Sequence, residues 1–220
     1  MGPLRRIGLL GDIHAEDTSL AVALRVLADA GVDALMAVGD IADGPGSVDR
    51  CCDLLATAGA LAVRGNHERW LLAGTMRDLP DATHTLGAEA RAFLGGLPAT
   101  RRFDVPGGQV LLCHGLGDDD MASVDPEDRI TKRYDPPLLT LLDEERTLWV
   151  LNGHTHRRGV WSERTLTIVN AGTLFREHDP CFVLVDLALR EVTYFDLDRS
   201  GGRVARQQTV PLPPPRGARR

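Results

Sequence analysis

Several residue types are scarce in this chain, and each scarcity narrows the class of protein. Of its 220 residues only Lys132 is a lysine, aromatic residues make up 5%, and the formal net charge is -6. A protein that binds nucleic-acid phosphates is expected to carry a broad basic face, and stacking on bases needs aromatic side chains. We therefore expect no nucleic-acid partner.

Long apolar runs and closely spaced cysteines are also missing. No apolar run approaches the roughly 18 residues that a membrane-spanning helix needs. The N-terminus lacks the apolar segment and small-residue cleavage site of a secreted protein. The four cysteines, Cys51, Cys52, Cys113 and Cys181, show no Cys-x-x-Cys spacing, and reduced thiols are the rule in the cytosol. We expect a cytoplasmic protein without membrane contact, and the sequence does not indicate its oligomeric state.

One arrangement is present repeatedly: a short apolar run that ends in a polar cluster. Continuous apolar runs of this length are typical of strands that are buried on both faces. The runs are Ile7–Leu10, Ala34–Val38, Leu61–Val63, Val110–Cys113, Leu148–Leu151 and Leu166–Val169.

Helical patterns alternate with these runs at residues 18–30, 47–58 and 86–95. This alternation predicts an α/β sheet with helices on both faces. Residues 181–187 and 191–197 instead predict two antiparallel strands joined by a short turn. We therefore expect mixed sheets, of the α/β (α+β) class.

Two stretches fall outside the alternation. Residues 116–137, which precede a helical pattern at 138–145, are rich in Asp, Pro and Arg and predict a loop or lid. From residue 201 onward the chain is polar and ends in a Pro/Arg-rich segment, which predicts an extended or disordered tail. We therefore expect one domain over residues 1–200 and a C-terminal tail over 201–220.

The polar clusters follow the predicted strands, at the edge of an α/β sheet where function collects. Carboxylate, imidazole and amide groups together form a mixed nitrogen and oxygen donor set, which suits Mn, Fe, Zn, Ni or Co better than Ca or Cu(I). His84 and His178 lie outside the clusters, and we interpret them as ordinary surface residues. The clustered residues are Asp12, His14, Asp40, Asn66, His67, His114, His154 and His156.

Eight such groups are too many for one tetrahedral ion but suit two. Two ions about 3.5–4 Å apart are the usual device for in-line displacement at phosphorus, where they polarise the phosphoryl oxygens and hold a hydroxide as nucleophile. The sequence therefore predicts two divalent transition-metal ions, with Mn favoured, and a small-molecule phosphoester as substrate.

The clusters in this order resemble the calcineurin-like metallophosphoesterases over residues 7 to about 187. The motifs are Gly11-Asp12-Ile13-His14, Gly39-Asp40, Gly65-Asn66-His67-Glu68, His114-Gly115 and Gly153-His154-Thr155-His156. Asn170-Ala171-Gly172-Thr173 is similar to the small bacterial and archaeal phosphodiesterase branch. The resemblance implies a four-layer β-sandwich of two mixed sheets flanked by helices, with the active site at the carboxyl ends of the strands.

The resemblance also implies a role for each clustered residue. Asp12, His14 and His156 would hold the first metal. Asn66, His114 and His154 would hold the second, and Asp40 would bridge both. His67 would be catalytic together with Asp40: it contacts the scissile phosphate and protonates the leaving oxygen, oriented by Asp40 or another carboxylate.

The substrate class depends on where the chain departs from relatives. Phosphoprotein phosphatases carry Arg after the second Asp of the second motif, whereas Asp43 is followed by Gly44. Because a monoester dianion benefits most from such an arginine, its absence favours a phosphodiester, although Glu68 favours phosphatases. Candidate substrate contacts are Asn66, Arg64 and Arg176, and Arg69 is a further candidate for the missing arginine.

Two other functions remain open at this stage. The same site could serve a phosphomonoesterase, a protein phosphatase or a dinucleoside-polyphosphate hydrolase. The chain could also be a non-catalytic metal-binding interaction module, as a retromer subunit of this fold is, but that subunit has lost ligand positions that are all filled here.

Overall fold

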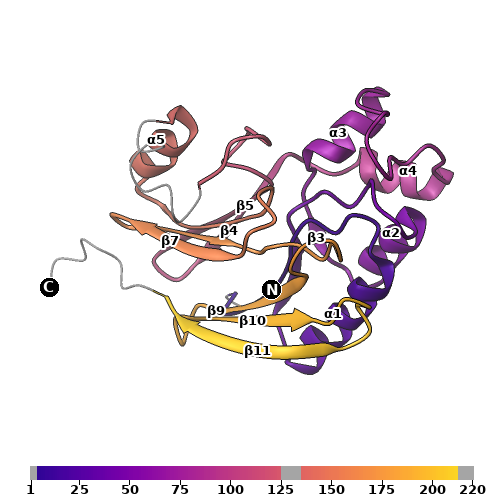
Figure 1. Ribbon diagram of the computed structural model, residues 1–220. Coiled ribbons are helices and arrows are strands. Elements are labelled where there is room, and N and C mark those ends of the chain that lie inside the picture. The colour runs from indigo at the N-terminus through magenta and orange to yellow at the C-terminus, as the bar shows by residue number, and fades with distance from the viewer. Residues whose placement is uncertain (1–3, 125–134, 213–220) are drawn as a thin grey trace, which may run out of the picture.

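The computed structural model describes residues 4–124 and 135–212, and within them eleven strands form two mixed sheets (Figure 1). The first sheet has the order β11-β10-β9-β1-β2-β3, and the second has the order β4-β5-β6-β8-β7. The strands of the first sheet are β1 (Arg6–Leu10), β2 (Ala34–Ala37), β3 (Leu61–Ala62), β9 (Cys181–Asp186), β10 (Glu191–Leu197) and β11 (Val204–Pro211). Those of the second are β4 (Thr100–Val105), β5 (Gly108–Cys113), β6 (Thr147–Asn152), β7 (Gly159–Glu163) and β8 (Leu166–Asn170).

Parallel pairing sets the direction of the strands that carry the polar clusters. In the first sheet β1 pairs in parallel with β2, and β2 with β3. In the second sheet β6 pairs in parallel with both β5 and β8. The outer strands complete each sheet in antiparallel pairs. The carboxyl ends of the parallel strands in each sheet therefore meet at one edge.

The helices cover the outer faces of both sheets, which makes four layers (Figure 1). Leu10 of β1 packs outward with apolar residues of α1 and α2, while its neighbour Leu9 packs inward between the sheets. In β5, Leu111 packs outward with α5, while Val110 packs inward. Successive side chains of a strand point to opposite faces, so these continuous apolar runs are buried on both sides. The helices are α1 (Asp17–Asp29), α2 (Val48–Thr57), α3 (Asn66–Ala73), α4 (Ala88–Gly95) and α5 (Pro136–Asp143).

The predicted sandwich of two mixed sheets flanked by helices is confirmed, and the differences are local. The polar cluster at Asn66 begins helix α3 rather than lying in a loop. Strands β4 and β7 were not predicted. None of the helices in the described ranges is long and apolar enough to cross a membrane.

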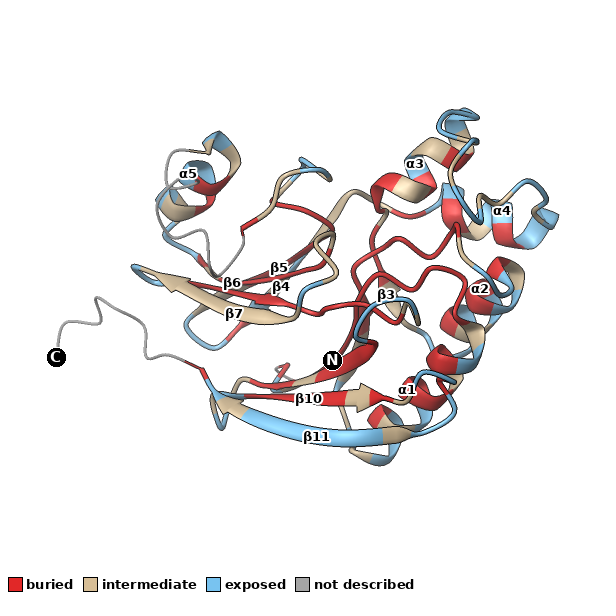
Figure 2. Cartoon of the chain, in the orientation of Figure 1, coloured by how far each residue is buried: buried red, intermediate tan, exposed pale blue. Residues whose placement is uncertain are grey.

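The predicted tail begins too early. Strand β11, Val204–Pro211, pairs with β10 through most of its length, so the first sheet extends beyond residue 200. The sequence of β11 is polar, like that of a disordered tail, because β11 is an edge strand whose residues are mostly exposed (Figure 2). Residues 213–220 of the predicted tail lie outside the described residues, as do residues 125–134 of the predicted lid.

Candidate active site

All seven predicted metal ligands lie together at one edge of the sandwich. The first sheet supplies Asp12 and His14 after β1, Asp40 after β2 and Asn66 after β3; the second sheet supplies His114 after β5 and His154 and His156 after β6. The side chains thus come from both sheets, and the cluster spans the gap between the layers.

The backbone that carries these side chains is strained. His14, Asp40 and Asp43 adopt φ angles of 45°, 47° and 61°, and His154 and His156 adopt 70° and 58°. Left-handed backbone at residues other than glycine persists only where the surroundings enforce it, and it gathers at functional sites. Several of the strained residues therefore gather at the edge where the candidate ligands lie.

Glu68 holds the strained loop at Asp40 in place. Its buried carboxylate accepts hydrogen bonds from the backbone N–H groups of Asp40, Ile41, Ala42 and Gly65, at 2.7 to 2.9 Å. These bonds join the loop after β2 to the start of α3. Glu68 therefore positions Asp40 and Asn66 relative to each other.

Close backbone approaches leave room for glycine alone at two positions. A Cβ atom at Gly65 would meet the carboxylate of Asp40, and a Cβ atom at Gly44 would meet the backbone oxygen of His14. Any side chain at these positions requires the neighbouring loop to move. The loops that carry Asp40 and His14 are therefore tightly packed against their neighbours.

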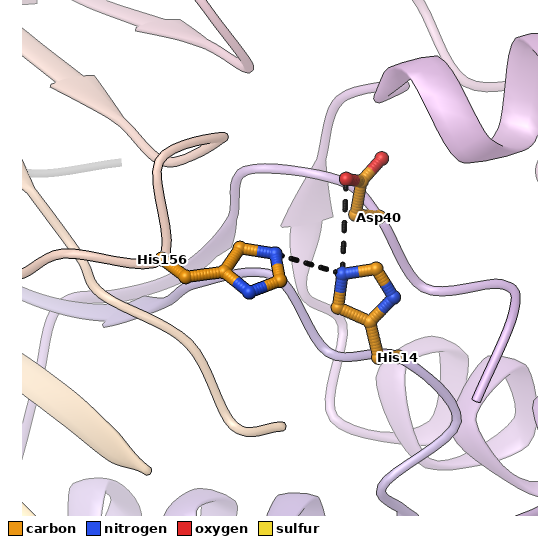
Figure 3. Close-up of side chains that lie close together, drawn as sticks. All are labelled: His14, Asp40 and His156. Atoms are coloured by element: carbon orange, nitrogen blue, oxygen red, sulfur yellow. Dashed lines mark hydrogen bonds and ion pairs between the residues drawn. The ribbon is translucent and has the colours of Figure 1, made fainter. Parts of the chain in front are cut away.

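The first group of candidate ligands contains Asp12, His14 and His156 beside Asp40. Nε2 of His14 lies 3.0 Å from Nε2 of His156 and 3.9 Å from Oδ2 of Asp40 (Figure 3). Oδ2 of Asp12 lies 3.8 Å from Nε2 of His156. His14, Asp40 and His156 therefore offer atoms close enough to share one ion.

The second group contains Asn66, His114 and His154 beside the same carboxylate. Oδ1 of Asn66 lies 2.9 Å from Nε2 of His114 and 3.1 Å from Nδ1 of His154. Nε2 of His114 is 3.3 Å from Oδ2 of Asp40. We call His14 and His114 the inner histidines of the two groups. Because one oxygen of Asp40 faces both of them, Asp40 stands between the two groups.

These contacts fit a bound cation better than they fit one another. Nδ1 of His14 lies 2.8 Å from the backbone oxygen of Asp43, and Nδ1 of His114 lies 2.9 Å from that of Val38. A carbonyl oxygen only accepts, so each Nδ1 carries a hydrogen and each ring turns its Nε2 into the cluster. There Nε2 of His14 meets Nε2 of His156, and Nε2 of His114 meets Oδ1 of Asn66. Buried Oδ2 of Asp12 also has no hydrogen-bond partner in the described part of the chain.

The pKa values of three of these histidines also favour a bound metal ion. Burial lowers the pKa of His14 and of His154, and it lowers the pKa of His156 to about 3, so these rings are neutral. Neutral imidazole is the form that binds metals. Burial raises the pKa of Asp12 to about 7.

His114 and Asp40 form the exception, since each stabilises the charge of the other. Burial opposes both charges, but Asp40 raises the pKa of His114 to about 10, and His114 holds the pKa of Asp40 well below its usual range. The proton on His114 thus sits where a metal cation would replace it.

His67 lies beside the cluster, and a carboxylate orients it. Its Nδ1 donates to Oδ2 of Asp43 at 2.8 Å, and its Nε2 lies 3.9 Å from Oδ2 of Asp40. Asp43 is therefore the orienting partner, while Asp40 accepts the backbone N–H of His67 at 3.0 Å. Burial opposes the charge of His67, but its hydrogen bond to Asp43 raises the pKa.

Of the arginines considered from the sequence, two are engaged in ion pairs. Arg176 donates to Glu16 from its backbone and from both ends of its guanidinium, and Arg69 forms a two-pronged pair with Asp120. Arg64 makes no side-chain hydrogen bond or ion pair within the described ranges. It lines a cleft of about 480 Å³ that also reaches His114.

His178 is an exposed surface residue, as the sequence interpretation has it, but it also contacts a candidate ligand. Its Nδ1 lies 2.6 Å from Nδ1 of His156, on the far side of that ring from the cluster. Asn170 is another contributor that the sequence did not single out individually: its amide donates to the backbone oxygen of Gly153 and to the hydroxyl of Thr155. Both residues support the loop that carries His154 and His156.

The family model of the calcineurin-like phosphoesterase superfamily domain matches residues 6–189, which is most of the chain. The chain belongs to this superfamily. It is therefore a hydrolase that acts on phosphoester bonds, in a family that depends on metal ions. No curated protein matches its sequence significantly.

Several solved structures share the fold of this calcineurin-like phosphoesterase over most of its chain. A metallophosphoesterase from Sphaerobacter thermophilus is 21% identical, with 89% of this chain and 88% of that chain covered and a TM-score of 0.63. A novel archaeal phosphodiesterase is 14% identical, with 87% and 99% covered and a TM-score of 0.57. Vacuolar Protein Sorting 29 from Cryptosporidium parvum is 16% identical, with 94% and 98% covered and a TM-score of 0.58. At these identities the similarity shows the fold.

Proposed function

We propose that this calcineurin-like phosphoesterase is a two-metal phosphodiesterase. The observation that supports this most directly is the convergence of seven metal-binding side chains from both sheets, among which buried Oδ2 of Asp12 has no hydrogen-bond partner within the residues that the structure describes. In the proposal Asp12, His14 and His156 hold one ion and Asn66, His114 and His154 hold the other. Asp40 would bridge both ions, because it faces the inner histidine of each group.

When bound, two such ions polarise the phosphoryl oxygens of the substrate and make a water molecule nucleophilic near neutral pH. The side chains of this chain would supply the remaining steps. Asn66 and Arg64 would bind the phosphate, since Arg64 lines the cleft beside the second group. His67, held by Asp43, would present Nε2 to the leaving oxygen and protonate it as the P–O bond breaks. Arg176 is committed to Glu16, so we leave it out of the proposal.

The substrate class follows from the arginine that is missing after Asp43. Gly44 packs against the backbone oxygen of His14, so this backbone has no space for any side chain at that position. A phosphomonoester carries more negative charge than a diester and gains more from an arginine fork. We therefore favour a phosphodiester over a monoester.

The proposed metal and location follow from the donors and the thiols. Manganese is our first choice, because three carboxylate or amide donors and four imidazoles form a mixed oxygen and nitrogen set. All four cysteines are free and buried, which suits a reducing compartment such as the cytoplasm.

Two measurements test the proposal. Elemental analysis of active protein should give about two ions per chain, and one ion or fewer would end the two-metal mechanism. With Mn, bis(4-nitrophenyl) phosphate should be hydrolysed faster than 4-nitrophenyl phosphate. A monoester preference of about tenfold, which is ~1.4 kcal/mol of transition-state stabilisation, would make the protein a phosphomonoesterase. Metal binding without turnover of either ester would favour the interaction module.

A further inference from the structure

The segment between α3 and α4 reaches back to the catalytic histidine. It leaves α3 at Gly74, whose φ of 69° ends the helix in left-handed geometry. Arg77 and Thr83 of this segment then contact Asp43, which lies more than thirty residues earlier and accepts the hydrogen bond from His67.

Arg77 forms a bidentate ion pair with both carboxylate oxygens of Asp43. Its two terminal nitrogens donate to Oδ1 and Oδ2 at 2.8 and 2.9 Å, the planar fork that binds a carboxylate most specifically. Its Nε donates to the backbone oxygen of Thr75, and one terminal nitrogen also reaches that of Thr83. Four of the five guanidinium hydrogens are thus occupied, so Arg77 is not available to clamp a phosphate.

Asp43 is saturated by this arrangement. Oδ1 accepts from Arg77 and from the backbone N–H of Thr83, while Oδ2 accepts from Arg77 and from His67. The residue is 4% exposed, so water has little access to replace a lost partner. With four donors around one buried carboxylate, the position of Oδ2 is fixed, and with it the ring of His67.

We propose that Arg77 is a positioning residue for His67: it fixes Asp43, and Asp43 holds His67 with Nε2 toward the reacting phosphate. This inference rests on the proposed function, in which His67 protonates the leaving oxygen. Arg77 would act on the reaction through His67 alone. Substitution of Arg77 should therefore lower the rate most for substrates whose leaving group depends most on protonation.

Matched aryl esters test this dependence. Nitrophenolate departs readily without a proton, whereas phenolate is a poorer leaving group and depends more strongly on protonation. We therefore compare bis(4-nitrophenyl) phosphate with diphenyl phosphate. Arg77→Gln should lower kcat/KM for the phenyl ester about tenfold, as expected for a residue that supports a reacting group, and change the nitrophenyl rate about twofold or less. Arg77→Lys should recover part of the loss. Arg91→Gln, on the exposed face of α4, is the control.

A double-mutant cycle separates positioning from structural support. If Arg77 acts through His67, adding Arg77→Gln to His67→Ala should cause no further loss, because residues that act as one unit are not additive. Equal losses on both esters, or losses that multiply in the double variant, would overturn the inference. If Arg77→Gln does not fold, Arg77→Lys carries the same comparison.

A second readout does not depend on turnover. In the proton NMR spectrum of metal-free protein, the Nδ1–H of His67 should give a protected resonance, identified by its disappearance in His67→Ala. Arg77→Gln should broaden or shift it, while Arg91→Gln leaves it in place. An unchanged resonance would overturn the inference even in a protein that hydrolyses neither ester, whereas inactivity of the wild type would count against the proposed function.

Discussion

The four histidines of the two candidate ligand groups fall into an inner and an outer pair that are built differently. The inner pair, His14 and His114, is 5% and 1% exposed, and each ring donates Nδ1–H to a backbone carbonyl. The outer pair, His154 and His156, comes from one loop after β6 and is partly exposed.

The difference shows which part of the site sets its position. Backbone carbonyls orient the inner rings: that of Val38 directly follows β2, and that of Asp43 lies in the loop after β2, which Glu68 joins to α3. The outer rings depend on side chains from elsewhere: Asn170, at the end of β8, holds their loop, and His178 contacts the ring of His156. The inner pair would therefore place the ions, and the outer pair would complete their coordination.

Asp40→Asn should have the largest effect, because Asp40 lies 3.9 Å from the Nε2 atom of His14 and 3.3 Å from that of His114. Loss of this shared charge should remove both ions and lower kcat about 10³-fold or more, since removing even one preorganised donor costs 10²–10³. Metal analysis and esterase assays with excess Mn check this. A larger loss of both ions in His14→Ala would show that Asp40 does not bridge.

The variants His114→Ala and His154→Ala compare an inner with an outer histidine within the second ligand group. The inner substitution leaves Asn66 and Asp40 buried without their partner, so it should weaken Mn binding about tenfold more than the outer one. Isothermal titration with Mn gives the two affinities, and unfolding curves recorded without metal control for stability. Equal affinities would remove the distinction between inner and outer rings.

Asn170→Ala should loosen the outer pair alone, because the Asn170 amide holds the loop at Gly153 and Thr155. We expect metal affinity to fall about 10–100-fold, the usual range for a residue that supports ligands. Asn152→Ala is the matched control, since Asn152 pairs with Asn170 across β6 and β8 but donates to Gly115 instead. A greater loss in Asn152→Ala would contradict the assignment.

His178→Ala should have the smallest effect of the series. It removes the partner of Nδ1 in His156, which is one exposed contact to one outer ring. Mn affinity should fall about tenfold or less, with activity restored at saturating Mn. A loss of activity that added metal does not restore would give His178 a role at the substrate.

The sequence predicts the sandwich and the convergence of the donors for a common reason. Apolar runs mark strands buried on both faces, and parallel strands must bring their carboxyl ends to one edge. Two of the elements that the sequence does not predict are rich in polar residues. Strand β11 is polar because it lies at an edge, and α3 is short and begins with the polar residues of a motif.

Long-range partners of the site residues follow no local pattern. Asp43 and Arg77 are 34 residues apart, and His156 and His178 are 22 apart. Their contacts depend on how loops fold over the strand ends, which neither spacing nor hydrophobic periodicity encodes. The residue types of the site are therefore readable from the sequence, whereas the side chains that orient them are not.

Because the candidate donors come from both sheets, each proposed ion would be a removable cross-link between the two layers. Asp12 and His14 belong to the first sheet and His156 to the second, and the other group is divided in the same way. A ligand that binds only the folded state stabilises it by about 2.7 kcal/mol at a hundred times its dissociation constant. Resistance of the protein to heat and proteolysis would then follow the metal supply of its surroundings, so that a metal-starved chain is both inactive and short-lived.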